Sequence, residues 1–155
     1  LLLTAVGLLR RERDGLELTP FYLDDYGVPY GYTPIMLARP ETIADRADTL
    51  ARFLDATGRG YEFAADNPED AARMLGETAD GPETLDDEQF LIESQQRLAD
   101  NYLTADGAWG QMAESRWTQF VEWLAEEEIL TTIDGDHIPA SQVEVTNLFT
   151  NELLS

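Results

Sequence analysis

Residues 48–70 read DTLARFLDATGRGYEFAADNPED and combine an apolar stripe with a helix boundary. Small and apolar side chains recur there at helical spacing and predict one buried face of a helix from about Asp48 to Asp66. These residues are Leu50, Phe53, Leu54, Thr57, Tyr61 and Ala64. Gly58 and Gly60 lie within this helix, and each weakens it by about 1 kcal/mol relative to alanine. Two glycines in mid-helix indicate close packing against a neighbouring element.

A second helix is predicted directly after the first. Asn67 has the place of its N-cap and Pro68 that of its first helical residue, and the helix runs to about Leu75. Three more helices are predicted from apolar spacing. They are an N-terminal helix that ends at Gly15, a helix through Phe90, Leu91, Leu98 and Tyr102, and a helix over Glu114–Glu126 with Trp117, Phe120, Val121 and Leu124 on one face.

Two short segments have the pattern of strands. Residues 16–23 partly alternate between apolar and polar, although Pro20 confines such a strand to an edge or an end. Residues 34–38 form an apolar run bounded by Pro34 and Pro40, which is typical of a short buried strand. The sequence therefore predicts an α/β fold that is predominantly helical, without an internal linker or repeat.

The composition is that of one ordinary domain with an extreme charge. The chain has 155 residues, of which 43% are hydrophobic, and its formal net charge is −21 from 31 acidic and 10 basic residues. A surface this negative repels phosphate, so nucleic acid is an unsuitable partner. All basic residues are arginine, and the excess of carboxylates indicates a protein from a halophile, because concentrated salt screens their mutual repulsion.

The motifs of enzymes and metal sites are absent from the sequence. It has no cysteine and one histidine, His137, in a polar loop beside Asp134 and Asp136. These aspartates do not form a calcium loop, because aligning Gly135 with the required glycine places Leu130 and Ser141 at the first and last ligand positions. We therefore predict no catalytic residue, no metal and no cofactor.

One cluster of side chains suits a ligand. Five aromatic residues surround a Gly-Val-Pro loop beside Asp24 and Asp25, namely Phe21, Tyr22, Tyr26, Tyr30 and Tyr32. Flat rings, together with a carboxylate that accepts from an exocyclic amine, are the groups that capture of an aminopyrimidine requires. The same rings could instead cover the edge of a small core. As ligand-binding residues we predict Asp25, Tyr26, Tyr30 and Tyr32.

Four segments in chain order resemble the family of thiamine-pyrimidine-precursor binding proteins. They are Asp25–Pro29 (DYGVP), Gly60–Ala72 (GYEFAADNPEDAA), Trp109–Met112 (WGQM) with Trp117 and Phe120–Leu124 (FVEWL), and Leu148–Leu154 (LFTNELL). The second segment resembles importers of sulfonates and nitrate as well. The Tyr-Gly-Val-Pro loop and the Phe-Thr-Asn-Glu-Leu ending are similar to the pyrimidine branch more narrowly.

The resemblance implies the C-terminal portion of a two-lobed type 2 periplasmic-binding-protein fold. Members have two α/β lobes joined by a hinge, bind their ligand in the cleft between the lobes and are longer than this chain. Residues 1–31 would correspond to the end of the second lobe and the hinge return, and residues 32–155 to the completion of the first lobe. A missing N-terminal half or a second chain would supply the rest.

The function that the resemblance implies is that of the substrate-binding component of an ABC importer. Its ligand would be a thiamine pyrimidine precursor of the hydroxymethylpyrimidine type, and its protein partner an ABC permease. Its location would be extracytoplasmic, with membrane attachment through an anchor outside this chain.

Three alternatives remain open for the function. One is a pyrimidine-synthase-like enzyme of the same superfamily, although that branch carries a cysteine-rich motif near residues 30–34, where this sequence has none. The others are a sister importer for sulfonate- or nitrate-type solutes and a vestigial or regulatory domain.

Overall fold

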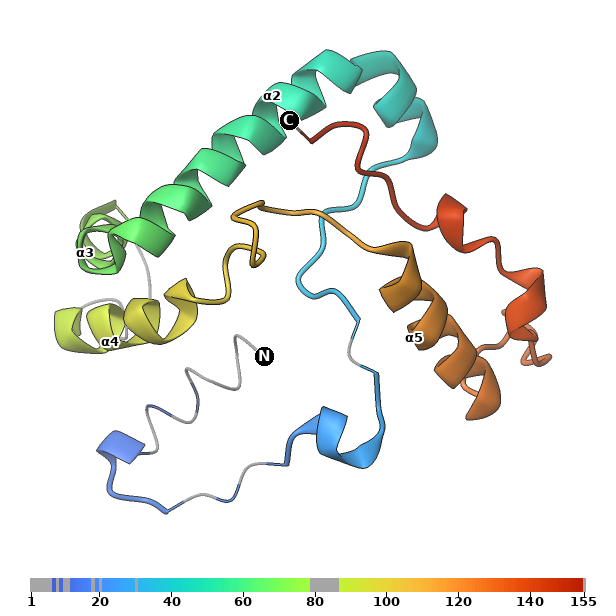
Figure 1. The fold of residues 1–155 in the computed structure, drawn as a ribbon, viewed down its shortest axis with the longest axis horizontal. Coiled ribbons are helices and arrows are strands. Elements are labelled where there is room, and N and C mark those ends of the chain that lie inside the picture. Colours follow the sequence, from blue (N-terminus) through green and yellow to red (C-terminus); the bar gives the residue numbers. More distant parts are fainter. Residues whose placement is uncertain are drawn as a thin grey trace. The chain divides into compact units, whose positions relative to one another are not determined.

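The computed structural model describes residues 7, 9, 12–17, 19, 21–29, 31–78 and 87–154. Over these residues the fold is mostly helical (Figure 1). The α-helices are α2 (Pro40–Asp66), α3 (Pro68–Thr78), α4 (Glu88–Ala99) and α5 (Glu114–Glu126), and the 3-10 turns are η1 (Leu23–Tyr26), η3 (Ala140–Gln142) and η4 (Val145–Asn147). In the described part of the chain, β pairing is limited to an isolated bridge between Thr131 and His137. The predominance of helix is therefore confirmed.

The helices largely follow the predicted stripes. The helix predicted from Asp48 begins eight residues earlier, at Pro40, and ends at Asp66 as expected. Arg46 has non-helical dihedrals (φ −130°, ψ 25°), so a short proline-led turn is joined to the regular helix across a kink. The last predicted helix, Glu114–Glu126, has the bounds of α5.

The boundary at Asn67 is confirmed, but its side chain acts differently from an N-cap. The Asn67 carbonyl accepts from the Ala71 N–H in the first turn of α3, while its side-chain amide donates to the Phe63 carbonyl of α2 at 3.1 Å. The Asn67 side chain therefore gives a hydrogen-bond donor to a carbonyl at the end of α2, and its backbone carbonyl accepts from an N–H at the start of α3. The helix predicted through Tyr102 ends at Ala99, before that residue is reached.

The strand predicted at residues 16–23 is wrong where the structure describes it. Residues 16, 17, 19, 21 and 22 join no ladder, and Leu23 begins the turn η1. The short buried strand predicted at residues 34–38 is also wrong, because these residues are exposed, bend at Pro34 and pair with no other described segment. The N-terminal helix is confirmed at the described positions Gly7, Leu9, Glu12 and Arg13. It ends at Gly15, whose φ of 75° lets its N–H donate to the Glu12 carbonyl.

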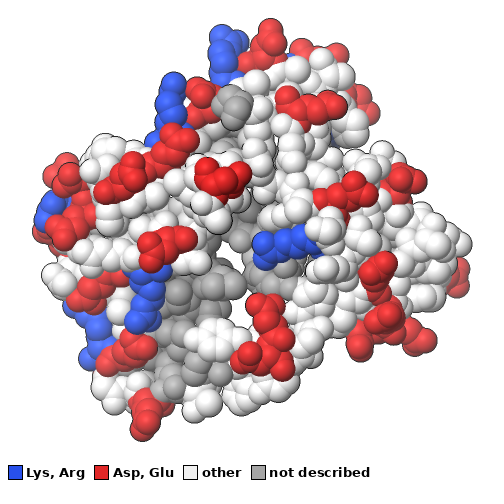
Figure 2. Space-filling view, in the orientation of Figure 1, with Lys and Arg blue, Asp and Glu red and all other residues white. Residues whose placement is uncertain are grey.

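Contacts divide the chain into two compact units. Unit 1 comprises Leu1–Thr19 and Arg52–Gly110, and unit 2 comprises Pro20–Ala51 and Gln111–Ser155. Acidic side chains are spread over the visible surface, where they outnumber the arginines (Figure 2). Among the described helices, none is long and apolar enough to cross a membrane. The lobe boundary predicted between residues 31 and 32 concerns a larger two-lobed protein and stays a prediction.

Unit 1 is built on the packing of α3 against α4. Ala72 of α3 is completely buried, and α4 buries Phe90, Leu91 and Leu98. Asp87 caps α4, because its carboxylate accepts from the Phe90 N–H at 2.9 Å.

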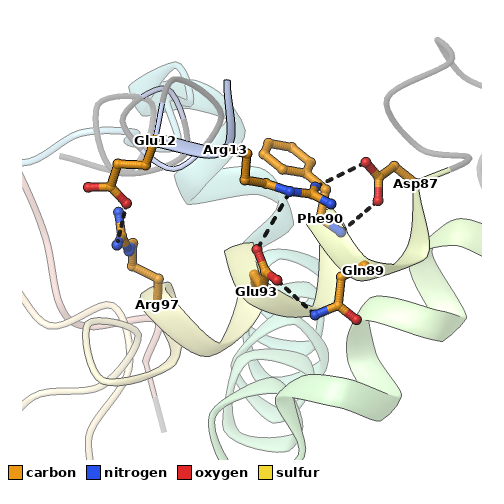
Figure 3. A network of polar contacts seen from close by, with 7 residues as sticks. All are labelled: Glu12, Arg13, Asp87, Gln89, Phe90, Glu93 and Arg97. Atoms are coloured by element: carbon orange, nitrogen blue, oxygen red, sulfur yellow. Dashed lines mark hydrogen bonds and ion pairs between the residues drawn. The ribbon is translucent and has the colours of Figure 1, made fainter. Parts of the chain in front are cut away.

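A polar network fastens the N-terminal segment to α4 (Figure 3). Arg13 pairs with Asp87 at 3.0 Å and lies over the Phe90 ring, with its guanidinium carbon 5.7 Å from the ring centroid. Arg97 pairs with Glu12 at 3.1 Å. Ion pairs this exposed contribute little individually, and the two together fix the register of the N-terminal segment along the helix.

An aromatic cluster in unit 1 explains one of the two glycines of α2. Tyr61 stacks on Trp109 with ring centroids 5.3 Å apart and meets Tyr102 edge-on at 5.2 Å. A Cβ added to Gly58 would lie 3.2 Å from Trp109 Cε3, whereas one added to Gly60 would meet no atom within 4 Å. The close packing predicted from the glycines is therefore found at Gly58 and not at Gly60.

Unit 2 is built around α5, which contacts η3 and η4. Val121 and Ala125 are its buried residues. A separate contact, between Phe120 of α5 and Gly31, joins the last third of the chain to the residues that precede α2.

Candidate ligand-binding loop and its anchor

The predicted loop begins with a tight 3-10 turn. Its turn η1 ends at Gly27, whose φ of 71° is natural for glycine and whose N–H donates to the Asp24 and Leu23 carbonyls. The Val28 N–H also donates a hydrogen bond to the Leu23 carbonyl at 3.2 Å. The backbone of the turn is thus held by local hydrogen bonds, while its side chains are exposed.

Asp25 and Tyr26 lie on this turn and are exposed. The Tyr26 ring is 65% exposed and tilts toward the 75% exposed Phe21 ring, with centroids 6.0 Å apart. An exposed carboxylate next to exposed rings can accept from an amine and stack on a flat ring. Two of the four predicted residues thus lie next to each other in sequence on one exposed turn. Tyr30 lies outside the described residues.

Tyr32 has a different environment from Asp25 and Tyr26. Its hydroxyl accepts from the Ala113 N–H at 2.7 Å, immediately before α5. The Arg116 guanidinium carbon lies over its ring, 4.6 Å from the centroid, and Trp117 lies on another side at 5.9 Å. Because these partners come from the first turn of α5, Tyr32 anchors the loop to that helix.

Further contacts complete this anchor, which we define as Gly31, Tyr32, Ala113, Arg116 and Trp117. Arg116 donates to the Gly31 carbonyl at 3.5 Å, and a Cβ on Gly31 would lie 3.4 Å from the Phe120 ring. Gly31 therefore sits where a side chain would press on α5. The loop is exposed at Asp25 and Tyr26 and held at Gly31 and Tyr32.

The C-terminal segment supports the anchor from the side of α5. Phe149 stacks on Trp117 with centroids 6.1 Å apart. The Asn151 amide makes two bonds to Met112, accepting from its N–H at 3.0 Å and donating to its carbonyl at 2.8 Å. The indole nitrogen of Trp117 is buried and has no acceptor among the described residues.

Arg116, Trp117, Phe149 and Asn151 are residues whose roles were missed from the sequence. Trp117, Phe149 and Asn151 lie in the segments that carry the family resemblance, but no periodic pattern ties them to the loop. Arg116 carries no signal beyond its charge. Contacts across about eighty residues of sequence, such as Ala113 to Tyr32, become visible only in the fold.

Acidic side chains of unit 1 surround one open hollow. The residues Asp66, Asn67, Pro68, Glu69, Asp70 and Gln96 line an open hollow of about 310 Å³. Two of its carboxylates have partners, since Arg73 pairs with Glu69 and Asp70, and Gln96 donates to Glu69. Among the described residues no group of three His, Asp or Glu side chains could hold a metal ion. His137 is exposed in the turn that follows Thr131.

Comparison with known proteins places the loop inside a family match. Residues 2–71 match the family model described as NMT1/THI5 like, a range that contains Asp25, Tyr26, Tyr30 and Tyr32. A formylaminopyrimidine-binding protein from Halalkalibacterium halodurans is 24% identical over 113 residues, which are 73% of this chain and 34% of that protein. The aligned part is about a third of the relative's length. No solved structure matches the chain.

These similarities support the family that the four segments resemble and the periplasmic-binding fold that this family implies. The first two segments, Asp25–Pro29 and nearly all of Gly60–Ala72, fall within the matched residues.

Proposed function

We propose that this chain is part of a solute-binding protein that captures a thiamine pyrimidine precursor and delivers it to an ABC importer. The observation that carries the proposal is the exposed Asp25–Tyr26 pair on a backbone-locked turn, within residues that match the NMT1/THI5-like family. The formylaminopyrimidine-binding relative suggests the ligand class, an aminopyrimidine with a hydroxymethyl or formylamino substituent.

Asp25 and Tyr26 divide the recognition of such a ligand. The Asp25 carboxylate accepts a hydrogen bond from the exocyclic amine, a charge-assisted contact worth about 1.5–3 kcal/mol. A tyrosine ring, Tyr26 or Tyr30, stacks on the pyrimidine and contributes about 0.5–1.5 kcal/mol. Tyr32 acts through the anchor, because its hydroxyl and one face of its ring are engaged by α5.

Isothermal titration calorimetry on the full-length protein tests the proposal. The ligands are 4-amino-5-hydroxymethyl-2-methylpyrimidine and its formylamino analogue, with taurine and nitrate as competing candidates. Asp25→Asn should weaken pyrimidine binding roughly 10- to 150-fold. Asp24→Asn is the matched control, because it removes the same charge one residue earlier in the same turn. If Asp25→Asn binds the pyrimidine as tightly as Asp24→Asn does, the loop is structural and the predicted contact is wrong.

The control ligands decide between the remaining functions. Binding of taurine or nitrate in place of the pyrimidine would assign the protein to a sister importer. A synthase-like enzyme would consume a precursor and release a pyrimidine product, which mass spectrometry detects. Binding is favoured over synthesis because the sequence has no cysteine at residues 30–34 or elsewhere.

The proposal extends to location and habitat. A capture protein for an importer works outside the cytoplasm and is held at the membrane by an anchor. Its permease partner would be met there. The net charge of −21 with no lysine suits a cell or medium of high salt.

A further inference from the structure

Arg116 has a place on α5 that the helix alone does not explain. It is the third residue of the helix, in the first turn, where the positive end of the helix dipole disfavours a cation. It is also the last arginine of a sequence without lysine. Its guanidinium carbon lies over the Tyr32 ring, 4.6 Å from the centroid, and its N–H donates to the Gly31 carbonyl at 3.5 Å. These contacts stabilise the loop, whereas the position of the charge is unfavourable for the helix.

The loop depends on side chains because its backbone has little support beyond the turn. Among the described residues, those at 31–38 take part in no backbone–backbone hydrogen bond. Residues 21–27 and 33–39 are exposed, whereas the described residues between these two stretches are half-buried. Burial along this part of the chain is therefore greatest at the anchor and next to it.

A short connection joins the anchor to the turn η1. Residues 28–30 lie between the C-cap of the turn and the anchor. The Val28 N–H is bonded to a carbonyl of the turn, and the ring of Pro29 fixes its own φ. A displacement of the anchor is therefore passed to the turn that carries Asp25 and Tyr26.

We propose that Arg116 is a positioning residue, which fixes the exposed turn with Asp25 and Tyr26 on α5 before any ligand arrives. This inference deepens the proposed function and rests on it for the identity of the ligand. A guanidinium can lie flat on a ring and donate from its edge at the same time, whereas an ammonium has no plane. Arg116→Lys should therefore keep the charge and lose the positioning.

NMR relaxation of the ligand-free protein tests the positioning directly. The backbone amides of Asp25 and Tyr26 should have order parameters of about 0.85 in the native protein and below about 0.6 in Arg116→Ala and Arg116→Lys. The control is Arg39→Ala, which removes the same charge from an exposed residue of the same unit and should retain the native values. Unchanged order parameters in the Arg116 variants, or values below about 0.6 in the native protein, would overturn the proposal.

Reciprocity between the ligand and the anchor provides a second test. If loss of the guanidinium lowers the anchored population to about a tenth, the dissociation constant for the pyrimidine rises about tenfold. The ligand must then favour the anchored state by a similar factor. The Ala113 N–H reports on this state, because it donates to the Tyr32 hydroxyl from the N-cap of α5.

Hydrogen exchange at Ala113 should be about tenfold faster in Arg116→Ala than in Arg39→Ala. Saturation of Arg116→Ala with 4-amino-5-hydroxymethyl-2-methylpyrimidine should slow it again by a similar factor. If Arg116 only supports the fold, the exchange of Ala113 does not respond to the ligand, and this result would refute the positioning role.

The two proposals fail separately. If the native protein binds the pyrimidine and Arg116→Ala binds it as tightly as Arg39→Ala, the capture function stands and the positioning role is wrong. If the native protein binds no pyrimidine, the proposed function is wrong, and the order parameters of the turn decide the role of Arg116.

Discussion

Two glycines two residues apart in α2 provide a controlled measurement of core packing. Both lie in the regular part of the helix, so alanine should stabilise the helix backbone by about 0.8–1.0 kcal/mol at either position. They differ in surroundings, because a Cβ on Gly58 would lie 3.2 Å from Trp109 Cε3 and a Cβ on Gly60 would meet nothing within 4 Å. Carbon atoms attract best at about 3.5–4.0 Å, so the Gly58 contact is repulsive unless Trp109 moves.

Trp109 has little room to move. Its ring stacks on Tyr61, and Tyr61 meets Tyr102, so a displacement of the indole is passed to two further rings. Overpacking of this kind costs about 1–3 kcal/mol. We therefore expect Gly60→Ala to stabilise the protein by about 1 kcal/mol. Gly58→Ala should lie between neutral and about 2 kcal/mol destabilising.

Thermal melts followed by circular dichroism in concentrated KCl measure the difference. For a chain of this size, each kcal/mol shifts the midpoint by about 2–4 °C, so Gly60→Ala should melt roughly 2–12 °C above Gly58→Ala. In a Trp109→Leu background the contact is removed, and Gly58→Ala should then recover the gain seen at Gly60. If Gly58→Ala is as stabilising as Gly60→Ala in the native background, the packing argument is wrong.

Three further expectations follow from charge, titration and hydrogen bonding. The melting midpoint should rise between 0.1 M and 3 M KCl, because a Debye length that falls from about 10 Å to below 3 Å screens the carboxylates; a flat or falling midpoint would contradict the halophile interpretation. Burial raises the pKa of Tyr102 in the folded state, so its contribution to stability is complete below the ordinary pKa of about 10 and is lost as pH rises through the folded pKa. Denaturant titrations at pH 8–12 should show a smaller loss of unfolding free energy in Tyr102→Phe. An identical loss in both proteins would exclude Tyr102 as its source. Asn151→Ala removes both bonds to Met112, each worth about 0.5–1.5 kcal/mol, and should cost about 1–3 kcal/mol of unfolding free energy, against less than about 0.5 kcal/mol for the equally exposed control Asn101→Ala. Similar losses would mean that the Asn151 bonds do not hold the C-terminal segment.

The helices were the most predictable part of the fold, because their signals are local. The stripe of α5 starts and ends within its own sequence, and its predicted bounds match. The start of α2 was missed because residues 40–45 carry no apolar stripe, although Pro40 followed by Glu41 is a typical helix start. At Asn67 the boundary was found, but whether its side chain would serve the helix before or the helix after depends on the geometry between them.

The strands were less predictable because a strand is completed by a partner remote in sequence. The apolar pattern at residues 34–38 predicts a buried strand, but no pattern in those residues says what they pair with, and the structure leaves them exposed and outside any strand. At residues 16–23 the alternation was too brief to outweigh Pro20 and the turn chemistry that follows, and the described residues there form no ladder.

The candidate site shows the same division between local and remote information. Asp25 and Tyr26 could be chosen from residue type, since a carboxylate and a ring beside a glycine-containing turn need only local sequence to become adjacent and exposed. Tyr32 belongs to the same aromatic cluster in the sequence, yet its hydroxyl and ring are engaged by a helix that begins eighty residues later. A binding loop needs an exposed tip for its ligand and a rigid base for its geometry. In the aromatic cluster Tyr26 lies on an exposed turn and Tyr32 contacts α5, so ligand contact stays a prediction for the exposed turn while Tyr32 has a structural role.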